Sequence, residues 1–334
     1  MAAQNNAPLP DGLDIAGYRI VKKIACGGFS IVYLAYDADG NAVAIKEYLP
    51  SALSLRQPGQ LVPLVSKANL ALFRIGLKCF FEEGRALAKI AHPNVVRVLN
   101  FFRANETVYM VMAYESGYSL QEHLLRQRAR GSRLSEAFIR QIFIQVLHGL
   151  RAVHANALLH LDLKPANIYL RSDGTPILLD FGAARQGLDS DRPRLAPMYT
   201  PGFAPPELYA RSASLGPWSD VYSIGAAMFA CMFGAPPQPA DQRQIGDRME
   251  AQFARLGGQY SQELLRLVRG CLMLDGLARP QSLFALQKVL LAAPAPLPQA
   301  DPLARWTGQV RSLAGRLGAL AHGKAAAAPN SLQS

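Results

Sequence analysis

Polar and apolar residues alternate through three early segments, residues 17–25, 30–36 and 41–49. A period of two is typical of β-strands, and the Gly-rich bend CGGFS and the Asp/Gly turn DADGN separate the segments. Three antiparallel strands are therefore predicted. Two more strand-like segments, residues 95–102 and 108–114, bring the expected number to five.

The apolar period lengthens to three and four positions over residues 72–90, which predicts an amphipathic helix. Its apolar stripe consists of Phe73, Leu77, Phe80, Leu87 and Ile90. Glu83 lies on this stripe, whereas Glu82 is turned about 100° away from it. The Glu83 carboxylate is therefore expected to point into the protein.

Helical patterns dominate the rest of the chain to about residue 292. Ser119 and Glu122 have the spacing of a capping box, which predicts the start of a helix. Apolar residues then recur at helical spacing over residues 137–154. A sheet-rich first part followed by a mostly helical second part predicts an α+β chain with two lobes.

Composition limits the class of protein. With 334 residues, 50% of them hydrophobic, the chain can form a substantial core. The four cysteines are far apart and form no CxxC pair, so neither a zinc site nor a disulfide framework is predicted. The start of the chain lacks the pattern of a secretory signal, and the most apolar segment, residues 222–237, is too short to span a membrane. A cytoplasmic protein is expected.

The formal net charge is +11, from 35 basic and 24 acidic residues. Such a charge can attract nucleic acid, an anionic membrane or an acidic partner. However, the sequence contains no nucleic-acid recognition motif, and the densest basic segment, LLRQRARGSR, has the composition of a solvated helix end. Charge therefore predicts no specific nucleic-acid partner.

The last part of the chain, residues 293–334, combines a Pro- and Ala-rich linker with a basic amphipathic segment. Over residues 303–320, apolar residues recur every three or four positions beside arginines. Three interpretations remain for this segment: an autoregulatory tail docked on the rest of the chain, a contact with a membrane surface or a partner, and a region without fixed structure.

A carboxylate on an apolar stripe needs a partner, because an unpaired buried charge costs several kcal/mol. Lys46, in VAIK on the third predicted strand, faces inward and is the expected partner of Glu83. A lysine held by a glutamate, beside a Gly-bearing turn between strands, is suited to placing a polyphosphate.

The segment LLHLDLKPANIYL, residues 158–170, presents three polar side chains from an apolar frame. Asp162 is expected to orient an acceptor hydroxyl and take its proton, and Lys164 to neutralise a phosphoryl group in transfer. Asn167, together with Asp180 of LLDFG, offers the oxygen ligands that Mg²⁺ takes when it also binds phosphates.

The order of VAIK, an inward Glu, HLDLKPAN and DFG resembles the eukaryotic-like (Hanks-type) serine/threonine protein kinases, in a bacterial form with a long insertion before helix C. The resemblance covers about residues 17–290. It implies a bilobal protein-kinase fold, with a five-stranded antiparallel N-lobe that carries helix C and a mainly helical C-lobe. The implied divisions are a flexible N-terminus, 1–16; a kinase domain, 17–292, with N-lobe 17–112, hinge 113–117 and C-lobe 118–292; and the tail, 293–334.

The resemblance also implies roles for individual residues, with ATP and Mg²⁺, or Mn²⁺ in its place, as cofactors. The catalytic residues are Asp162 and Lys164, and the metal ligands are Asn167 and Asp180. The ATP-binding residues are Lys46, Glu83, Gly27, Val32, Ala44, Met112 as gatekeeper, and Ala113 and Glu115 in the hinge. The residues of the substrate loop YTPGFAPPE and its structural support are Thr200, Glu207, Asp220 and Arg279.

The chain departs from the family pattern at three places. Ala25 and Ser30 replace the outer glycines of the glycine loop, which predicts looser ATP affinity. Leu161 replaces the arginine of HRD, so control by activation-loop phosphorylation is not favoured. Residues 47–80 form the long insertion, which either fixes the following helix in its active position or is a tolerated surface loop.

Three functions fit this sequence. The leading hypothesis is a protein Ser/Thr kinase in intracellular signalling, with ATP and an unknown protein substrate as partners. The alternatives are a nucleotide-binding pseudokinase that acts as a regulatory scaffold, because the glycine loop is incomplete, and a small-molecule phosphotransferase. The substrate loop and Arg279 favour a protein substrate over a small molecule.

Overall fold

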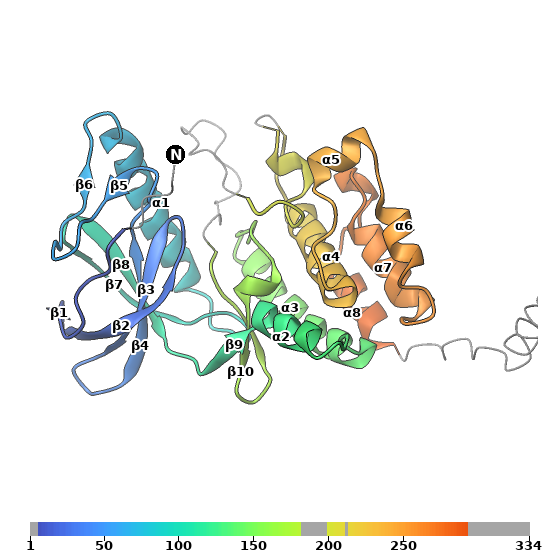
Figure 1. Cartoon of the computed structure of the whole chain (residues 1–334), viewed down its shortest axis with the longest axis horizontal. Helices are drawn as coiled ribbons and strands as arrows, with labels where there is room; N and C mark the ends of the chain where they lie inside the picture. The colour runs from blue at the N-terminus through green and yellow to red at the C-terminus, as the bar shows by residue number, and fades with distance from the viewer. Residues whose placement is uncertain (1–5, 182–198, 211–212, 293–334) are drawn as a thin grey trace, which may run out of the picture. The chain divides into compact units, whose positions relative to one another are not determined.

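The computed structural model describes residues 6–181, 199–210 and 213–292. These residues belong to one compact unit, Met1–Ala293, and a second unit, Pro294–Ser334, lies outside the described residues. Within the first unit a sheet-rich lobe precedes a helical lobe (Figure 1). The predicted α+β order is confirmed. The tail segment, residues 303–320, and its three interpretations fall outside the described residues.

The first lobe contains an antiparallel sheet of six strands in the order β1-β2-β3-β4-β8-β7. The strands are β1 (Asp14–Ile15), β2 (Tyr18–Cys26), β3 (Ser30–Tyr36), β4 (Ala42–Tyr48), β7 (Val98–Ala104) and β8 (Thr107–Ala113). Five of them are the predicted strands. The sixth, β1, is too short to show a period of two, which is why the sequence pattern misses it.

The two faces of this sheet have different neighbours. Alternation along β4 puts Lys46 on one face and Ile45 and Glu47 on the other. The helix α1 (Leu70–Leu87) covers the Lys46 face through Phe73 and Phe80, whose rings lie 5.4 and 5.7 Å from the ring of Tyr48. This helix is the one predicted over residues 72–90.

The opposite face forms a separate core with the start of the chain. Leu9, Ile15 and Tyr33 are buried there. The Leu9 N–H donates to the Tyr33 hydroxyl at 3.1 Å, and the Ala7 N–H donates to the Arg56 carbonyl at 2.9 Å. Residues 6–15 were expected to belong to a flexible N-terminus, but they pack on the sheet, because Leu9 and Ile15 supply apolar surface to a face that would otherwise be exposed.

The insertion contributes to this second core. It contains the short strands β5 (Ser54–Leu55) and β6 (Leu64–Val65), and between them Arg56 is only 1% exposed. The Arg56 guanidinium donates to both oxygens of the fully buried Glu47, at 2.6 and 2.7 Å. Residues 47–50, Ser54 and Arg56 are buried, which favours a structural role for this part of the insertion over a tolerated surface loop.

The second lobe is mainly helical. Its helices are α2 (Leu120–Ala129), α3 (Glu136–Ala155), α4 (Pro217–Phe233), α5 (Ala240–Ile245), α6 (Met249–Ala254), α7 (Gln262–Cys271) and α8 (Leu283–Leu291), with single turns of 3₁₀-helix at Pro165–Asn167, Pro206–Leu208 and Gly276–Ala278. A small antiparallel sheet joins β9 (Gly117–Ser119), β10 (Ile168–Arg171) and β11 (Pro176–Leu178) in the order β11-β10-β9. The predicted capping box of Ser119 and Glu122 opens α2.

The helix α4 is buried along most of its length, because nearly all its side chains are apolar or small. It contains residues 222–233 of the most apolar segment of the sequence, and Gly234 ends the helix in the left-handed conformation at φ 82°. Among the described residues, no helix combines the length and the hydropathy needed to cross a membrane.

Candidate active site

Asp220 of α4 binds the backbone of the loop between α3 and β10. The fully buried Asp220 carboxylate accepts hydrogen bonds from the backbone N–H groups of His160, at 2.9 Å, and Leu161, at 2.8 Å. It also contacts His154 Nε2 at 2.7 Å. Burial raises the pKa of Asp220, but the contacts with His154 and His160 together outweigh it and the net pKa lies below the ordinary value, so the carboxylate stays ionised.

His160 links this loop to the segment before Asp180. Its Nε2 lies 3.0 Å from the Leu179 carbonyl, which can only accept, so Nε2 carries the proton. The other nitrogen, Nδ1, is then free to accept from the Asp162 N–H at 3.4 Å. Burial lowers the pKa of His160, and the ring is therefore a neutral structural bridge at pH 7.

Two residues of the site have left-handed backbone conformations that are unusual for side chains of their size. Leu161 has φ 59° and Asp180 has φ 51°. The two backbone hydrogen bonds to Asp220 fix the conformation of the first, and its side chain is buried at 3% exposure. Such backbone strain persists only where surrounding contacts determine it, and it is concentrated at functional sites.

Asp162, Lys164 and Thr200 form one hydrogen-bonded group. Lys164 Nζ lies 2.7 Å from Asp162 Oδ2 and 2.8 Å from Thr200 Oγ1. The Thr200 hydroxyl in turn donates to Asp162 Oδ1 at 3.1 Å. The three side chains come from the loop after α3 and from the predicted substrate loop, so a carboxylate, a cation and a hydroxyl converge at one place.

Asn167 is oriented by the same aspartate. Its amide nitrogen donates to the Asp162 carbonyl at 2.8 Å and to Asp162 Oδ2 at 3.0 Å. Within the described residues no hydrogen bond reaches the amide oxygen, which is therefore available as a ligand. An amide oxygen and the half-exposed Asp180 carboxylate are the oxygen donors that suit Mg²⁺ when phosphates and water complete its coordination.

Lys46 pairs with Asp180 rather than with Glu83. Lys46 Nζ lies 3.0 Å from Asp180 Oδ1, and among the described residues no ion pair joins it to Glu83. The expected direct Lys46–Glu83 contact is therefore wrong for this structure. Both carboxylates still act on the lysine: burial lowers its pKa, but Asp180 and Glu83 outweigh burial and raise it, so the ammonium stays charged.

The surroundings of Glu83 make its side chain a weaker acid. Burial raises the pKa of Glu83 to about 8, although the positive charge of Lys46 acts in the opposite direction. The physical reason is that α1 holds the carboxylate beside apolar residues such as Phe80 without bringing it within ion-pair distance of Lys46. The helix places Glu83 on the inward face as predicted, but not in contact with its expected partner.

The remaining predicted ATP-binding residues lie on the Lys46 face of the sheet or at its end. Val32 pairs with Lys46, and Ala44 pairs with Met112, in the ladders of β3, β4 and β8. Ala113 ends β8, and its N–H donates to the Arg97 carbonyl at 2.9 Å. These positions line up along one strip of the sheet.

The Glu115 side chain is already occupied. Arg171 of β10 donates to both of its carboxylate oxygens, at 2.9 and 2.8 Å, and to the Pro93 carbonyl at 2.8 Å. The Glu115 carbonyl also accepts from the Tyr169 hydroxyl at 3.2 Å, so within the described residues the backbone N–H is the group of Glu115 that remains for a ligand. Arg171 ties together the segment after β8, the loop before β7 and β10.

The glycine loop between β2 and β3 is tied to the insertion. Gly27 N–H donates to the Ser30 carbonyl at 2.9 Å. The Leu49 N–H donates to the Phe29 carbonyl at 2.7 Å, and Ser51 donates to the Gly28 carbonyl through its N–H at 2.9 Å. The first residues of the insertion therefore hold the tip of this loop from outside.

Glu207 and Arg279 form the expected ion pair. Arg279 donates to both carboxylate oxygens, at 2.7 and 2.9 Å, and its side chain is fully buried. It also donates to the Trp218 carbonyl at 2.9 Å and lies over the Tyr222 ring at 5.0 Å. This buried bidentate pair fixes the end of the substrate loop to the start of α4.

A comparison with known sequences agrees with this arrangement. The sequence profile described as "Protein kinase domain" matches residues 18–291. The chain belongs to the protein kinase family. Among curated kinases, serine/threonine-protein kinase PknK of Mycobacterium tuberculosis (strain CDC 1551 / Oshkosh) is 33% identical over 254 residues, which are 75% of this chain and 20% of PknK. Serine/threonine-protein kinase B of Synechocystis sp. (strain ATCC 27184 / PCC 6803 / Kazusa) is 24% identical over 265 residues, 75% of this chain and 43% of that kinase.

Solved kinase structures resemble this chain as well. The structure titled "PpkA-294 apo form" has a TM-score of 0.74 and 34% sequence identity, and the match covers 85% of this chain and 99% of that one. The kinase domain of Mycobacterium tuberculosis PknI, with 22% identity and a TM-score of 0.60 over 85% of this chain and 98% of that one, shares the fold. This kinase chain spans about a fifth of the length of PknK.

Sequence motifs could not identify several residues that position the kinase site. Arg171 is a lone arginine at the end of a short strand, and His154 lies six residues before a motif whose first residue is His160. Each of them contacts residues far away in sequence. Their contacts with Glu115 and Asp220 are set by the packing of β10, α3 and α4, which no local period encodes.

Proposed function

We propose that this chain is a protein serine/threonine kinase that transfers the γ-phosphoryl group of ATP to a hydroxyl of a protein substrate in intracellular signalling. The observation that carries the proposal is the group formed by Asp162, Lys164 and Thr200. A carboxylate beside a cation and a hydroxyl is what transfer to an alcohol needs, because the carboxylate takes the proton of the acceptor and the cation stabilises charge on the transferred group.

In this proposal Thr200 lies next to the place where the acceptor hydroxyl of the substrate binds. Its own hydroxyl already donates to Asp162 Oδ1 at 3.1 Å. A serine or threonine acceptor of similar size can approach the same oxygen, whereas the larger tyrosine ring would need the substrate backbone to lie further away. The buried Glu207–Arg279 pair holds the loop that contains Thr200 in place for a protein segment.

Mg²⁺ would be held by Asn167 and Asp180 and would neutralise the charge of the bound phosphates. Mn²⁺ has a similar preference for oxygen ligands and is expected to replace it. Within the described residues no cluster of three or more His, Cys, Asp or Glu side chains could hold a metal. Two protein ligands fit an ion that shares its coordination with a nucleotide.

The direct test is transfer of radiolabel from ATP to a generic basic protein, followed by analysis of the phosphorylated amino acids. Label on serine and threonine that disappears when EDTA removes the metal is the expected result. If the protein gains thermal stability with MgATP but transfers no label, the pseudokinase alternative replaces this proposal. Label on a small molecule alone would favour a small-molecule phosphotransferase.

A cytoplasmic location of the protein remains a prediction.

Asp180→Ala is expected to weaken binding of MgATP about tenfold, because one of the two metal ligands is lost. Binding of ATP in EDTA should change much less, since Lys46 and the sheet are still present. Isothermal titration with and without Mg²⁺ measures both affinities. An unchanged affinity for MgATP would remove Asp180 from the metal site, provided that circular dichroism shows the variant to be folded.

Restoring glycines at the two outer positions of the glycine loop is expected to lower the KM for ATP about two- to threefold, because glycine lets the backbone approach the phosphates more closely. The double variant Ala25→Gly with Ser30→Gly should leave kcat near the parent value. Steady-state kinetics with varied ATP measure both constants. An unchanged KM would mean that the contacts of Leu49 and Ser51 already hold the loop in a competent position.

A further inference from the structure

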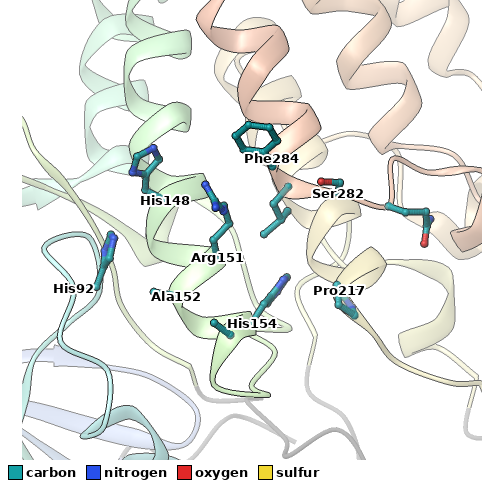
Figure 2. Close-up of a pocket in the computed structure, with 11 residues that line it drawn as sticks. His92, His148, Arg151, Ala152, His154, Pro217, Ser282 and Phe284 are labelled. Atoms are coloured by element: carbon teal, nitrogen blue, oxygen red, sulfur yellow. The ribbon is translucent and has the colours of Figure 1, made fainter.

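A cavity of about 660 Å³ lies on the second lobe, and none of the proposed catalytic, metal or ATP-binding residues lines it. Its walls come from α3, from the loop before β7, and from the starts of α4 and α8 (Figure 2). The cavity is open to solvent, with exposed side chains such as His148, Arg151 and Phe284 in its walls, which suits an extended segment of protein chain better than a small molecule. The side chains that line it decide what it could bind.

Three basic or imidazole side chains project from α3 into this cavity. His148, Arg151 and His154 follow at intervals of three, which places them along the same side of the helix. Figure 2 shows them on the side of α3 that faces Ser282 and Phe284 of the α8 region, with His92 at the edge of the cavity. None of the described residues that line the cavity is acidic.

Two of these side chains have hydrogen-bond donors directed by the fold. His92 Nδ1 accepts from the Asn94 N–H at 3.1 Å, so the proton of the neutral ring lies on Nε2. Arg151 donates through Nη1 to Gln287 at 3.2 Å, and its guanidinium lies 5.5 Å from the centre of the Phe284 ring. In the part of the chain that the structure describes, no hydrogen bond uses the other Arg151 nitrogens, so the guanidinium is held in place with donors to spare.

The imidazoles are close enough to influence each other. Burial and the neighbouring His148 lower the pKa of His92. The Arg151 guanidinium is a fixed positive charge, and the two imidazoles beside it add hydrogen-bonding groups. With no carboxylate among the described lining residues, an anion with several acceptor oxygens would satisfy this site. Phosphate is such an anion, because it offers three acceptor oxygens and nearly two negative charges at pH 7.

We propose that this cavity is a docking site for a phosphorylated protein segment, in which a phosphoserine or phosphothreonine contacts Arg151, His148 and His92. Arg151 supplies the positive charge for the phosphate, and the imidazoles supply further hydrogen-bonding groups. The cavity is larger than one phosphate requires, and Phe284, which is 61% exposed, adds an apolar wall for a neighbouring side chain. The proposal concerns binding and stands whether or not the chain transfers phosphate.

The cavity also touches the support of the catalytic loop. His154 lines it and contacts Asp220 Oδ2 at 2.7 Å, and Asp220 binds the backbone of His160 and Leu161. Only the His154 side chain therefore separates a docked segment from Asp220, which holds the catalytic loop. This position suits a site that recruits substrates already phosphorylated elsewhere.

The test uses the full chain and two fluorescein-labelled nonapeptides, each with a central serine flanked by leucines, one of them phosphorylated at that serine. Fluorescence anisotropy should show at least about tenfold tighter binding of the phosphorylated peptide, as expected for hydrogen bonds between charged groups. Arg151→Gln should remove most of this preference, and His148→Gln, at an exposed position, should reduce it without affecting the fold. Arg128→Gln on α2 is the control for general charge and should bind like the parent.

Asp162→Asn separates this site from the active site and should bind the phosphopeptide as the parent does. Equal affinity for the two peptides would overturn the proposal, as would a preference that survives both Arg151→Gln and His148→Gln. Competition by inorganic phosphate at the same concentration as the phosphopeptide would show a simple anion site and would also overturn it. So would binding of vesicles that contain phosphatidic acid without binding of the peptide.

Discussion

Asp162→Asn is expected to lower the turnover number by a factor of about 10² or more. An amide has almost the same shape as the carboxylate but cannot take a proton from an acceptor hydroxyl. It also loses the charge that holds Lys164 Nζ at 2.7 Å from Oδ2. Because a factor of 10² in rate corresponds to about 2.7 kcal/mol of activation free energy, this change is well outside experimental scatter.

Nucleotide affinity is the readout that distinguishes loss of chemistry from loss of structure. The Asp162→Asn variant should bind MgATP nearly as the parent does, because Lys46 and Asp180 pair with each other and the oxygen of the new amide can still accept from the Asn167 amide. Steady-state phosphorylation of a basic protein gives the turnover number, and titration calorimetry gives the affinity. If the variant retains more than about a third of the parent turnover, Asp162 is not the base and general base catalysis by this residue is refuted.

The sequence predicts most of this site because the motifs are local. Asp162, Lys164 and Asn167 lie within six consecutive residues, and the apolar residues around them place all three side chains on one loop. Asp180 follows a buried strand in the same way, and the apolar stripe of α1 correctly turns Glu83 inward. In each case a short segment carries both the side chain and the pattern that orients it.

The sequence does not predict contacts between segments that are distant along the chain. The pairing of Lys46 depends on the distance between β4 and α1, which sequence spacing does not determine, and the structure brings Asp180 to the lysine instead of Glu83. The N-terminal segment is a similar case. Leu9 and Ile15 are too few and too irregular to show a period, yet they cover a face of the sheet that only the folded chain creates.

The insertion contains one feature that the sequence predicts, the direction of Glu47, and one that it does not, the partner of Glu47. Its first residue, Glu47, continues the alternation of β4 and so points to the face opposite Lys46, where no charged partner is near in sequence. Arg56 reaches it from nine residues further on. Tyr33 and Tyr109 complete the group by donating their hydroxyls to Glu47 at 2.7 and 2.6 Å. Burial and the charge of Glu47 raise the pKa of both tyrosines, so their hydroxyls stay protonated and remain donors.

The buried group of Glu47, Arg56, Tyr33 and Tyr109 lies in the same part of the fold as the contacts of the insertion with the N-terminal segment, the glycine loop and α1. Arg56 binds the N-terminal segment through the Ala7 carbonyl at 2.8 Å, while Leu49 and Ser51 bind the tip of the glycine loop. On the other face, Tyr48 packs on Phe73 of α1. A change at Arg56 is therefore expected to affect the stability of the whole first lobe and, through Leu49, the position of the glycine loop.

Arg56→Leu is expected to lower the free energy of unfolding by about 3–5 kcal/mol, because it leaves the carboxylate of Glu47 buried without a cation. Both side chains of the pair are fully buried, so water cannot compensate for the loss. Chemical denaturation followed by circular dichroism measures the change. Such a loss is a large part of the 5–15 kcal/mol that stabilises a typical domain.

The double variant Arg56→Leu with Glu47→Leu decides whether the unpaired charge is the cause. Removing both charges should restore much of the lost stability, because a buried ion pair and a pair of apolar residues are often similar in free energy. The exposed pair of Lys78 and Glu82 on α1 supplies the matched control, since Lys78→Ala should change stability by less than about 0.5 kcal/mol. If Arg56→Leu costs no more than Lys78→Ala, Glu47 does not depend on Arg56, and the insertion is not held to the sheet by this pair.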